Sequence, residues 1–118
     1  MIMFLNFEEY NIYLKPGATD MRKGSASLSV IVEKEMELCA FNKSIFVFCS
    51  KNKRVFKAIL WDENGFFEIT KRLECGMGFK WPTIEDKHIF VTSDEIIGIL
   101  KGCDMMRKFP ILNPKKVV

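Results

Sequence analysis

The sequence predicts an α+β fold in which a mostly antiparallel β-sheet of about four or five strands carries one longer N-terminal helix on a face. Two observations support this fold class. Runs rich in β-branched and aromatic residues follow one another between residues 44 and 81, and such runs are typical of strands. The segments 19–38 and 92–101 begin with capping residues, so we expect a helix in each, the second one short.

The 118 residues are expected to form a single domain. Within it we expect an irregular arm or short first strand at 1–9, a core at 10–103 and a loosely ordered basic tail at 104–118. No apolar run approaches the ~20 residues of a membrane span, and the apolar start of the chain lacks the flanks of a signal peptide. We therefore expect a cytoplasmic protein with no membrane partner.

The first elements are a strand and a helix. Tyr10–Leu14 predicts a strand that ends at the turn signal Lys15-Pro16-Gly17. The helix that follows is expected to run to about Leu38, with Thr19 or Asp20 as its N-cap. Its predicted apolar face comprises Leu28, Ile31, Val32 and Glu35 or Met36.

A three-stranded meander is predicted for the centre of the chain, at Ile45–Cys49, Arg54–Trp61 and Phe66–Leu73. We expect Phe79–Trp81 to return as a short strand and His88–Val91 to be a brief extended segment. Thr92 and Glu95 have the spacing of a capping box. The helix that they open is expected to end near Lys101 and to bury Ile96, Ile99 and Leu100.

The turn at Asn64-Gly65 predicts a β-hairpin but leaves two registers open. With a two-residue loop, Glu63 pairs with Phe66 and Lys57 lies opposite Arg72. With a three-residue loop, Asp62 pairs with Phe66 and Lys57 lies opposite Lys71. Like charges that face each other across a strand pair are destabilising, so both registers predict an anion, or a carboxylate from elsewhere in the fold, near Lys57.

The residues that could carry catalysis or bind metal are sparse. The four cysteines lie far apart and form no CxxC pair, and the chain has one histidine, so we expect buried, reduced thiols and no metal. The aspartates are scattered, and no phosphate-loop or dinucleotide-binding motif is present. The sequence therefore predicts a protein that is not an enzyme and needs no cofactor.

Positive charge is concentrated in the hairpin region. The formal net charge is +3, and residues 51–81 alone carry seven basic and four acidic side chains. Aromatic residues lie between these cations in the sequence, although most of the rings are expected to be core. Cations on a sheet suit nucleic acid, because they release phosphate counterions. The candidate nucleic-acid-binding residues are Lys51, Lys53, Arg54, Lys57, Lys71, Arg72, Lys80, Arg22 and Lys23.

Arg22 and Lys23 are unusual if they lie in the first turn of a helix, because the helix dipole favours acidic groups there. A bound phosphate would resolve the conflict. Two alternatives need no ligand: Arg22 pairs with a carboxylate such as Asp20, or the helix begins later, near Ser25.

Three segments carry a resemblance to a known family: YLKPGATDMRKG at 13–24, FVFCSKNKRVFKAILWDENGFF at 46–67 and KRLECGMGFKWP at 71–82. In order and spacing they resemble the Orf2-like accessory proteins, called TnpB, of the IS-sixty-six family of insertion sequences. The combination of TDMRKG with a downstream tryptophan–acid–glycine–phenylalanine pattern and KRLE is specific. The resemblance covers Tyr13 to Pro82 and not the tail.

This resemblance implies a bacterial protein that assists a separate DDE-type transposase, without implying a defined biochemical activity. The first hypothesis is an accessory factor that binds DNA, such as the element ends, through the basic hairpin. The alternative is an adapter that docks the transposase through the same basic and aromatic face without contacting DNA. Other proteins of the element and a second copy of the chain are further possible partners.

Overall fold

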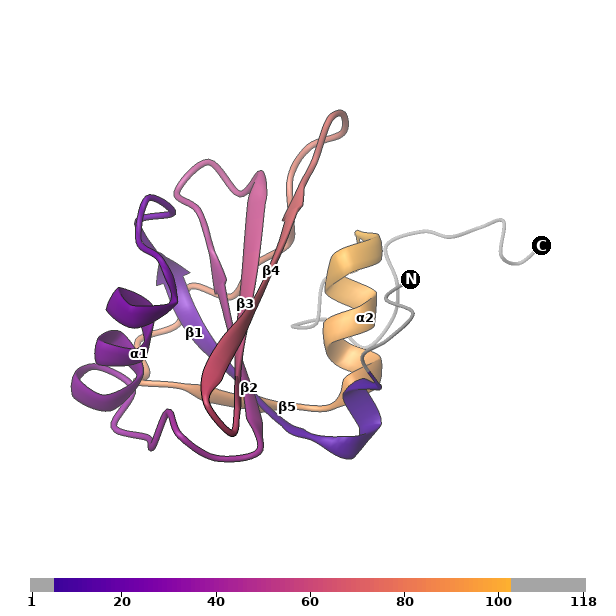
Figure 1. Cartoon of the computed structure of the whole chain (residues 1–118). Coiled ribbons are helices and arrows are strands. Elements are labelled where there is room, and N and C mark those ends of the chain that lie inside the picture. Colours follow the sequence, from indigo (N-terminus) through magenta and orange to yellow (C-terminus); the bar gives the residue numbers. More distant parts are fainter. Residues whose placement is uncertain (1–5, 103–118) are drawn as a thin grey trace.

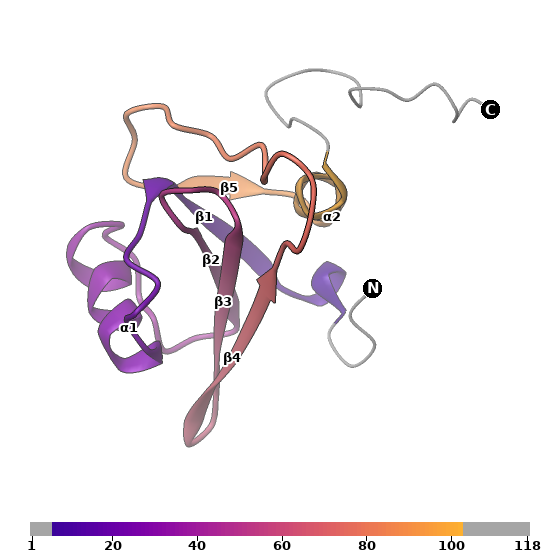
Figure 2. The same ribbon diagram turned by 90° about the horizontal axis from the view of Figure 1, so that it is seen from above.

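The computed structural model describes residues 6–102, which form a five-stranded sheet with a helix on each face (Figure 1). Figure 2 shows the same three layers from above. The strand order is β4-β3-β2-β1-β5. The elements are η1 (Phe7–Glu9, a 3₁₀ turn), β1 (Asn11–Ala18), α1 (Ser25–Lys34), β2 (Ser44–Cys49), β3 (Val55–Asp62), β4 (Gly65–Arg72), β5 (Ile89–Val91) and α2 (Ser93–Lys101).

The predicted α+β class and mostly antiparallel sheet are confirmed, with one exception. β1 and β2 pair in parallel, whereas the other neighbouring strands are antiparallel. The chain passes through α1 between β1 and β2, which is the kind of crossover that a parallel pair requires. All six residues of β2 are buried, as expected of a central strand that is covered on both faces.

β1 does not end at Lys15-Pro16-Gly17 as predicted, but continues to Ala18. The pairing of β1 with β2 is interrupted between Leu14 and Ala18. Proline is accepted at such an irregularity because no ladder hydrogen bond is needed from its nitrogen. The strand therefore delivers Thr19 beside the end of β2, where its amide donates to the carbonyl of Cys49 at 2.8 Å.

α1 is shorter at both ends than the predicted helix, running from Ser25 to Lys34. Its N-cap is Gly24, so neither Thr19 nor Asp20 caps it. The carbonyls of Met21 and Lys23 accept hydrogen bonds from the Lys57 ammonium, both at 3.0 Å, which holds residues 19–24 as a loop. The predicted buried face is confirmed for Leu28, Ile31, Val32 and Met36.

Both predicted hairpin registers are wrong. Asp62 pairs with Gly65 around a turn at Glu63-Asn64, and Lys57 lies opposite Thr70. Glu63, rather than Gly65, has the positive φ, at 54°. This register places Trp61 opposite Phe66, with ring centroids 5.1 Å apart. It also removes the facing cations from which an anion or a carboxylate near Lys57 was predicted. A carboxylate is nevertheless present there, because Glu68 pairs with Lys57 at 3.1 Å.

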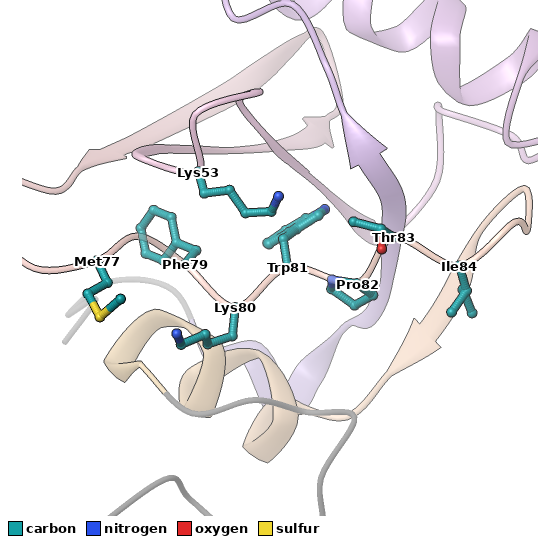
Figure 3. A pocket seen from close by; sticks show the side chains of 8 residues that line it. All are labelled: Lys53, Met77, Phe79, Lys80, Trp81, Pro82, Thr83 and Ile84. Atoms are coloured by element: carbon teal, nitrogen blue, oxygen red, sulfur yellow. The ribbon is translucent and has the colours of Figure 1, made fainter.

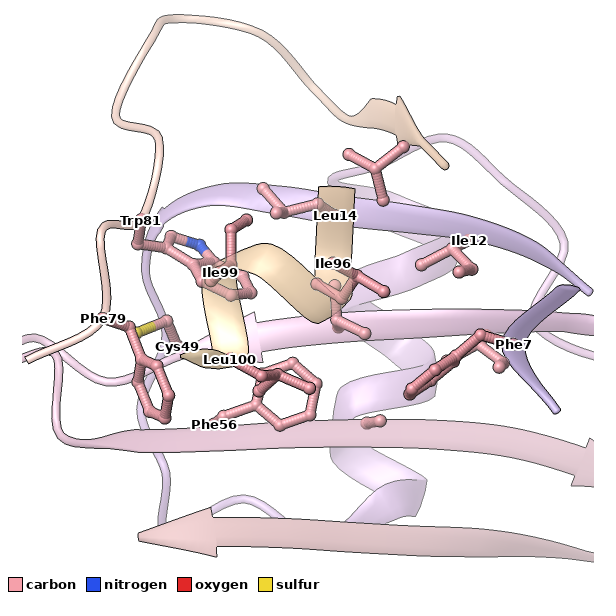
Figure 4. Packing of buried hydrophobic residues seen from close by; sticks show 14 of the residues in the cluster. Phe7, Ile12, Leu14, Cys49, Phe56, Phe79, Trp81, Ile96, Ile99 and Leu100 are labelled. Atoms are coloured by element: carbon pink, nitrogen blue, oxygen red, sulfur yellow. The ribbon is translucent and has the colours of Figure 1, made fainter. Parts of the chain in front are cut away.

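Two apolar clusters fix the helices to the sheet. The cluster under α2 is drawn in Figure 4 and includes Phe56, Phe79 and Trp81. The cluster under α1 includes Phe46, Phe48 and Ile59. Phe79–Trp81 is not a strand as predicted; its two rings pack into the α2 side, and the Trp81 indole donates to the carbonyl of Lys15 at 2.9 Å.

The last elements match their prediction. Thr92 and Glu95 form a complete capping box at the start of α2, and Ile96, Ile99 and Leu100 are buried. Within the expected N-terminal arm, residues 7–9 form the 3₁₀ turn, and Phe7 is buried in the α2-side cluster. The predicted basic tail lies outside the described residues.

Candidate nucleic-acid interface

Three loops meet at one end of the sheet, the upper end in Figure 1. The first loop follows β1 at residues 19–24, and the second joins β2 to β3 at residues 50–54. The third follows β4 and is taken as residues 71–80, which includes the last two residues of that strand. We call these residues the basic end, because they carry eight basic and two acidic side chains. The basic residues are Arg22, Lys23, Lys51, Lys53, Arg54, Lys71, Arg72 and Lys80.

The β2–β3 loop is held by its own polar side chains. The Ser50 hydroxyl accepts from the amides of Arg54 and Val55, at 3.1 and 3.0 Å, and donates to Asn52 Oδ1 at 2.7 Å. Lys53 adopts a left-handed conformation with φ of 63°. This internal network fixes the loop backbone and leaves the Lys51 side chain exposed at its tip.

The loop after β4 packs against the β2–β3 loop. The Leu73 amide donates to the Arg54 carbonyl at 2.8 Å, and the Phe79 amide donates to the Lys53 carbonyl at 2.7 Å. The Arg54 guanidinium donates to the Gly76 carbonyl at 2.7 Å. Arg54 therefore positions this loop as well as adding charge to the basic end.

An open groove of about 490 Å³ lies where these two loops meet (Figure 3). Lys53 and Lys80 lie on opposite sides of it in the view, and Met77 at its edge is 89% exposed. Phe79 and Trp81 form part of the wall, but both are buried. The groove thus offers cationic flanks and an apolar rim, and its rings are engaged in the core.

Lys57 does not lie on the surface of the basic end. Its side chain is 12% exposed and forms an ion pair with Glu68 at 3.1 Å. The same ammonium donates to the carbonyls of Met21 and Lys23. Through these three partners Lys57, on β3, connects β4 and the 19–24 loop. Its positive charge therefore stabilises the fold and is not available at the surface.

Two more predicted cations have partners within the protein. The Lys71 ammonium donates to the Leu100 carbonyl at 3.0 Å, near the end of α2. The Arg22 guanidinium pairs with the Asp20 carboxylate at 2.8 Å, and this pairing holds the pKa of Asp20 well below its ordinary value. Both ligand-free alternatives for Arg22 and Lys23 are thus met, since Arg22 pairs with Asp20 and the helix begins at Ser25.

The remaining cations of the basic end have no partner in the described part of the chain; Lys51 and Arg72 are exposed, and the other three are half-buried. Among residues 6–102, no acceptor forms a hydrogen bond or ion pair with the side chains of Lys23, Lys51, Lys53, Arg72 or Lys80. All five are among the cations predicted from the sequence. Thr19, Met77 and Ile84 also line cavities here, but they were not predicted, because Thr19 was assigned to a helix cap and Met77 and Ile84 to loops.

A cluster of partly exposed aromatic rings lies at the other end of the sheet, near the β3–β4 turn. Phe41, Trp61 and Phe66 contact one another with ring centroids 5.0–5.6 Å apart. Phe41 is 50% exposed and the neighbouring Phe67 is 51% exposed. We call Phe41, Trp61 and Phe66 the aromatic end. It lies at the opposite end of the sheet from the basic end, whereas the sequence predicted one basic and aromatic surface.

Within residues 6–102, no three side chains among the cysteines, aspartates, glutamates and His88 lie close enough together to hold a metal ion. The prediction of buried thiols is correct for Cys49 and wrong for Cys39 and Cys75, which are exposed. No helix in the same part of the chain is long and apolar enough to cross a membrane.

Comparison with known proteins places the chain in one family. The family model described as IS66 Orf2 like protein matches residues 10–109, so the likeness extends beyond Pro82. An uncharacterized protein of Sinorhizobium fredii, y4hO, is 30% identical over 110 residues, covering 93% of this chain and 95% of that protein. No solved structure matches.

Proposed function

Because the chain belongs to the IS66 Orf2-like family, a family of transposition accessory proteins, we propose that it binds DNA through the basic end and assists a separate transposase. In this proposal the protein performs no catalysis and acts in the bacterial cytoplasm, where the element DNA and the transposase meet. The element ends are the DNA on which such a factor would act.

One observation carries the proposal. Loops from three distant parts of the sequence bring eight basic and two acidic side chains to one end of the sheet. Clustered like charges raise the cost of folding unless a counter-charge binds. A polyanion supplies that counter-charge, and DNA carries one phosphate charge per ~1.7 Å of helix axis.

The contacts expected from these residues are to phosphates rather than to base edges. Lysines dominate the unpartnered cations, and lysine acts on phosphate as a flexible point charge. The ordered rings near the groove, Phe79 and Trp81, are buried and present no face on which a base could stack. We therefore expect binding with little dependence on sequence, sufficient to hold DNA while the transposase selects the site.

Neutralising the cations of the basic end by substitution tests this proposal. The triple variant Lys51→Gln/Lys53→Gln/Lys80→Gln removes three unpartnered cations of the basic end and leaves Arg54 and Lys57 in their structural roles. A matched control, Lys34→Gln/Lys43→Gln/Lys87→Gln, makes the same change of net charge at exposed positions elsewhere. We expect the first variant to lose most of its affinity for a short DNA duplex and the control to keep it. Equal loss in both would contradict the basic end as the binding surface.

A second candidate function is a protein contact through the aromatic end. Protein interfaces are enriched in Trp and Phe, and Phe41 is half-exposed beside Trp61 and Phe66. In this case the chain is an adapter for the transposase, and the surface used differs from the basic one. Capture of purified transposase that survives nuclease treatment and is lost in Phe41→Ser would support it; capture unchanged by Phe41→Ser would argue against this surface.

A further inference from the structure

A second cavity at the basic end is shallow and open to solvent, and it lies between the end of β1 and the β2–β3 loop. Its volume is about 680 Å³. The bond from the Thr19 amide to the Cys49 carbonyl holds its two sides together. The residues that line it are Thr19, Asp20, Met21, Ser50, Lys51 and Asn52.

Thr19 lines this cavity, and its side chain carries a polar group that no described residue pairs with. The residue is only 7% exposed, and its hydroxyl is buried without a hydrogen-bond partner among residues 6–102. Buried polar groups in native proteins are nearly always paired, because an unmade hydrogen bond there has a substantial free-energy cost. A ligand atom that accepts from the Thr19 hydroxyl would remove that cost.

The charges around the cavity favour an anion. Asp20 is the one acidic residue of the lining, and its carboxylate is engaged by the amide and the guanidinium of Arg22 at 2.8–3.3 Å. The Lys51 ammonium is exposed and unpaired within residues 6–102, and the amides of Lys51 and Asn52 also donate to no acceptor there. The cavity therefore presents donors, and its carboxylate is already neutralised.

We propose that the cavity between Thr19 and Lys51 binds a phosphate group of the DNA backbone, with the Thr19 hydroxyl and the Lys51 ammonium as donors to its oxygens. This inference rests on the proposed function and adds a defined phosphate subsite to it. A hydroxyl that no described residue pairs with in the free protein would gain its acceptor on binding, so Thr19 would act in the complex rather than in the fold.

Thr19→Val tests the subsite, because valine keeps the branched shape and removes the hydroxyl. Removing an unpaired hydroxyl should leave the melting temperature of the free protein equal to or above that of the wild type. The affinity for a short duplex should nevertheless fall roughly tenfold, the value of a hydrogen bond to a charged group. Thr19→Ser, which keeps the hydroxyl, should restore most of the affinity.

The outcomes separate this inference from the proposed function. If Thr19→Val binds duplex as tightly as wild type while the Lys51/Lys53/Lys80 triple variant does not, the subsite is wrong and DNA binding stands. If wild type binds no DNA, both the proposed function and its phosphodiester ligand are contradicted. Inorganic phosphate is then the probe: stabilisation of wild type but not of Thr19→Val would retain the cavity as a phosphate site, and stabilisation of neither would overturn it.

Discussion

Lys57 shows how a cation that the sequence marks for binding can be used in the fold. It belongs to a run of four basic residues within seven positions, and the charge alone does not distinguish it from Lys51 or Lys53, which precede the predicted strand Arg54–Trp61. The difference comes from the strand, because Lys57 lies within β3 and faces the 19–24 loop and Glu68. Position in the sheet, rather than the charge itself, determines the role.

Lys57→Met should lower the free energy of unfolding by about 2–4 kcal/mol, because it leaves two carbonyls and the Glu68 carboxylate without their cation. Denaturant unfolding measures this difference. Lys51→Met removes an exposed, unpaired cation, so it should change stability by less than about 0.5 kcal/mol. Equal stability of the two variants would show that the Lys57 contacts contribute nothing.

Cys49 is the cysteine for which burial has a chemical consequence. Desolvation raises the pKa of its thiol to about 11, with the nearby Lys53 opposing the shift. Since the thiolate is the reactive form, Cys49 should resist alkylation at pH 8 in the folded protein while Cys39 and Cys75 react. Peptide mass analysis after labelling reads each site separately, and rapid labelling of native Cys49 would contradict its burial.

The raised pKa also predicts the sign of a pH effect. The neutral thiol is favoured in the folded state, so its contribution to stability is complete below the ordinary pKa of 9.0 and is lost as pH rises toward about 11. Cys49→Ala should therefore show a smaller loss of stability between pH 8 and pH 11 than wild type.

At the scale of elements, the boundaries and registers that depend on neighbouring residues were predicted correctly. Those that depend on a contact with a distant part of the sequence were not. The capping box at Thr92 and Glu95 is complete within four residues, and α2 begins where predicted. The predicted start of α1 was wrong, because the loop before the helix is held by a hydrogen bond from Lys57, which lies 34 residues after Lys23. The β3–β4 register depended on the Trp61–Phe66 ring contact and on Glu68 reaching Lys57, which turn chemistry alone cannot reveal.

The loop after β4 depends on a glycine that admits a close backbone approach. Gly78 has φ of 107°, and a Cβ added there would lie 3.1 Å from Lys53. Gly78→Ala should destabilise the protein by more than about 1 kcal/mol, because strain and the clash act together. It should also weaken DNA binding, since the groove is formed by this loop.

Gly76 offers a matched control for that substitution. It also has a positive φ, of 91°, but an added Cβ would meet open space. Gly76→Ala should therefore carry only the conformational strain and cost less than Gly78→Ala in thermal or denaturant unfolding. Equal costs would mean that the contact with Lys53 is unimportant.

At the scale of the whole molecule, the fold separates two kinds of surface. Cations gather where β1 and β4 end, and the ring cluster of the aromatic end lies near the β3–β4 turn. The sequence predicted the cations of the hairpin region, because they are clustered along the chain. It could not show that Thr19 and Lys51 share a cavity, since the parallel pairing of β1 with β2 joins segments separated by a helix.

The positions of the aromatic rings relative to the cations could not be predicted from the sequence either. Phe56, Phe67 and Phe79 lie in the same stretch of sequence as the hairpin cations. In the fold, Phe56 and Phe79 are core, whereas Phe67 is exposed near the opposite end. A period-two pattern says that neighbours in a strand face opposite sides, but not which side a helix will cover. The separation of cations from rings follows from α2 covering Phe56 and Phe79.

The central claim is that the unpartnered cations of the basic end hold DNA phosphates, and its most direct test is the salt dependence of duplex binding. If Lys23, Lys51, Lys53, Arg72 and Lys80 each neutralise one phosphate, log K should fall against log salt with a slope of about −4.5. The triple variant Lys51→Gln/Lys53→Gln/Lys80→Gln should reduce the magnitude of that slope by about 2.7. A flat salt dependence, or a slope that the triple variant leaves unchanged, would contradict the claim.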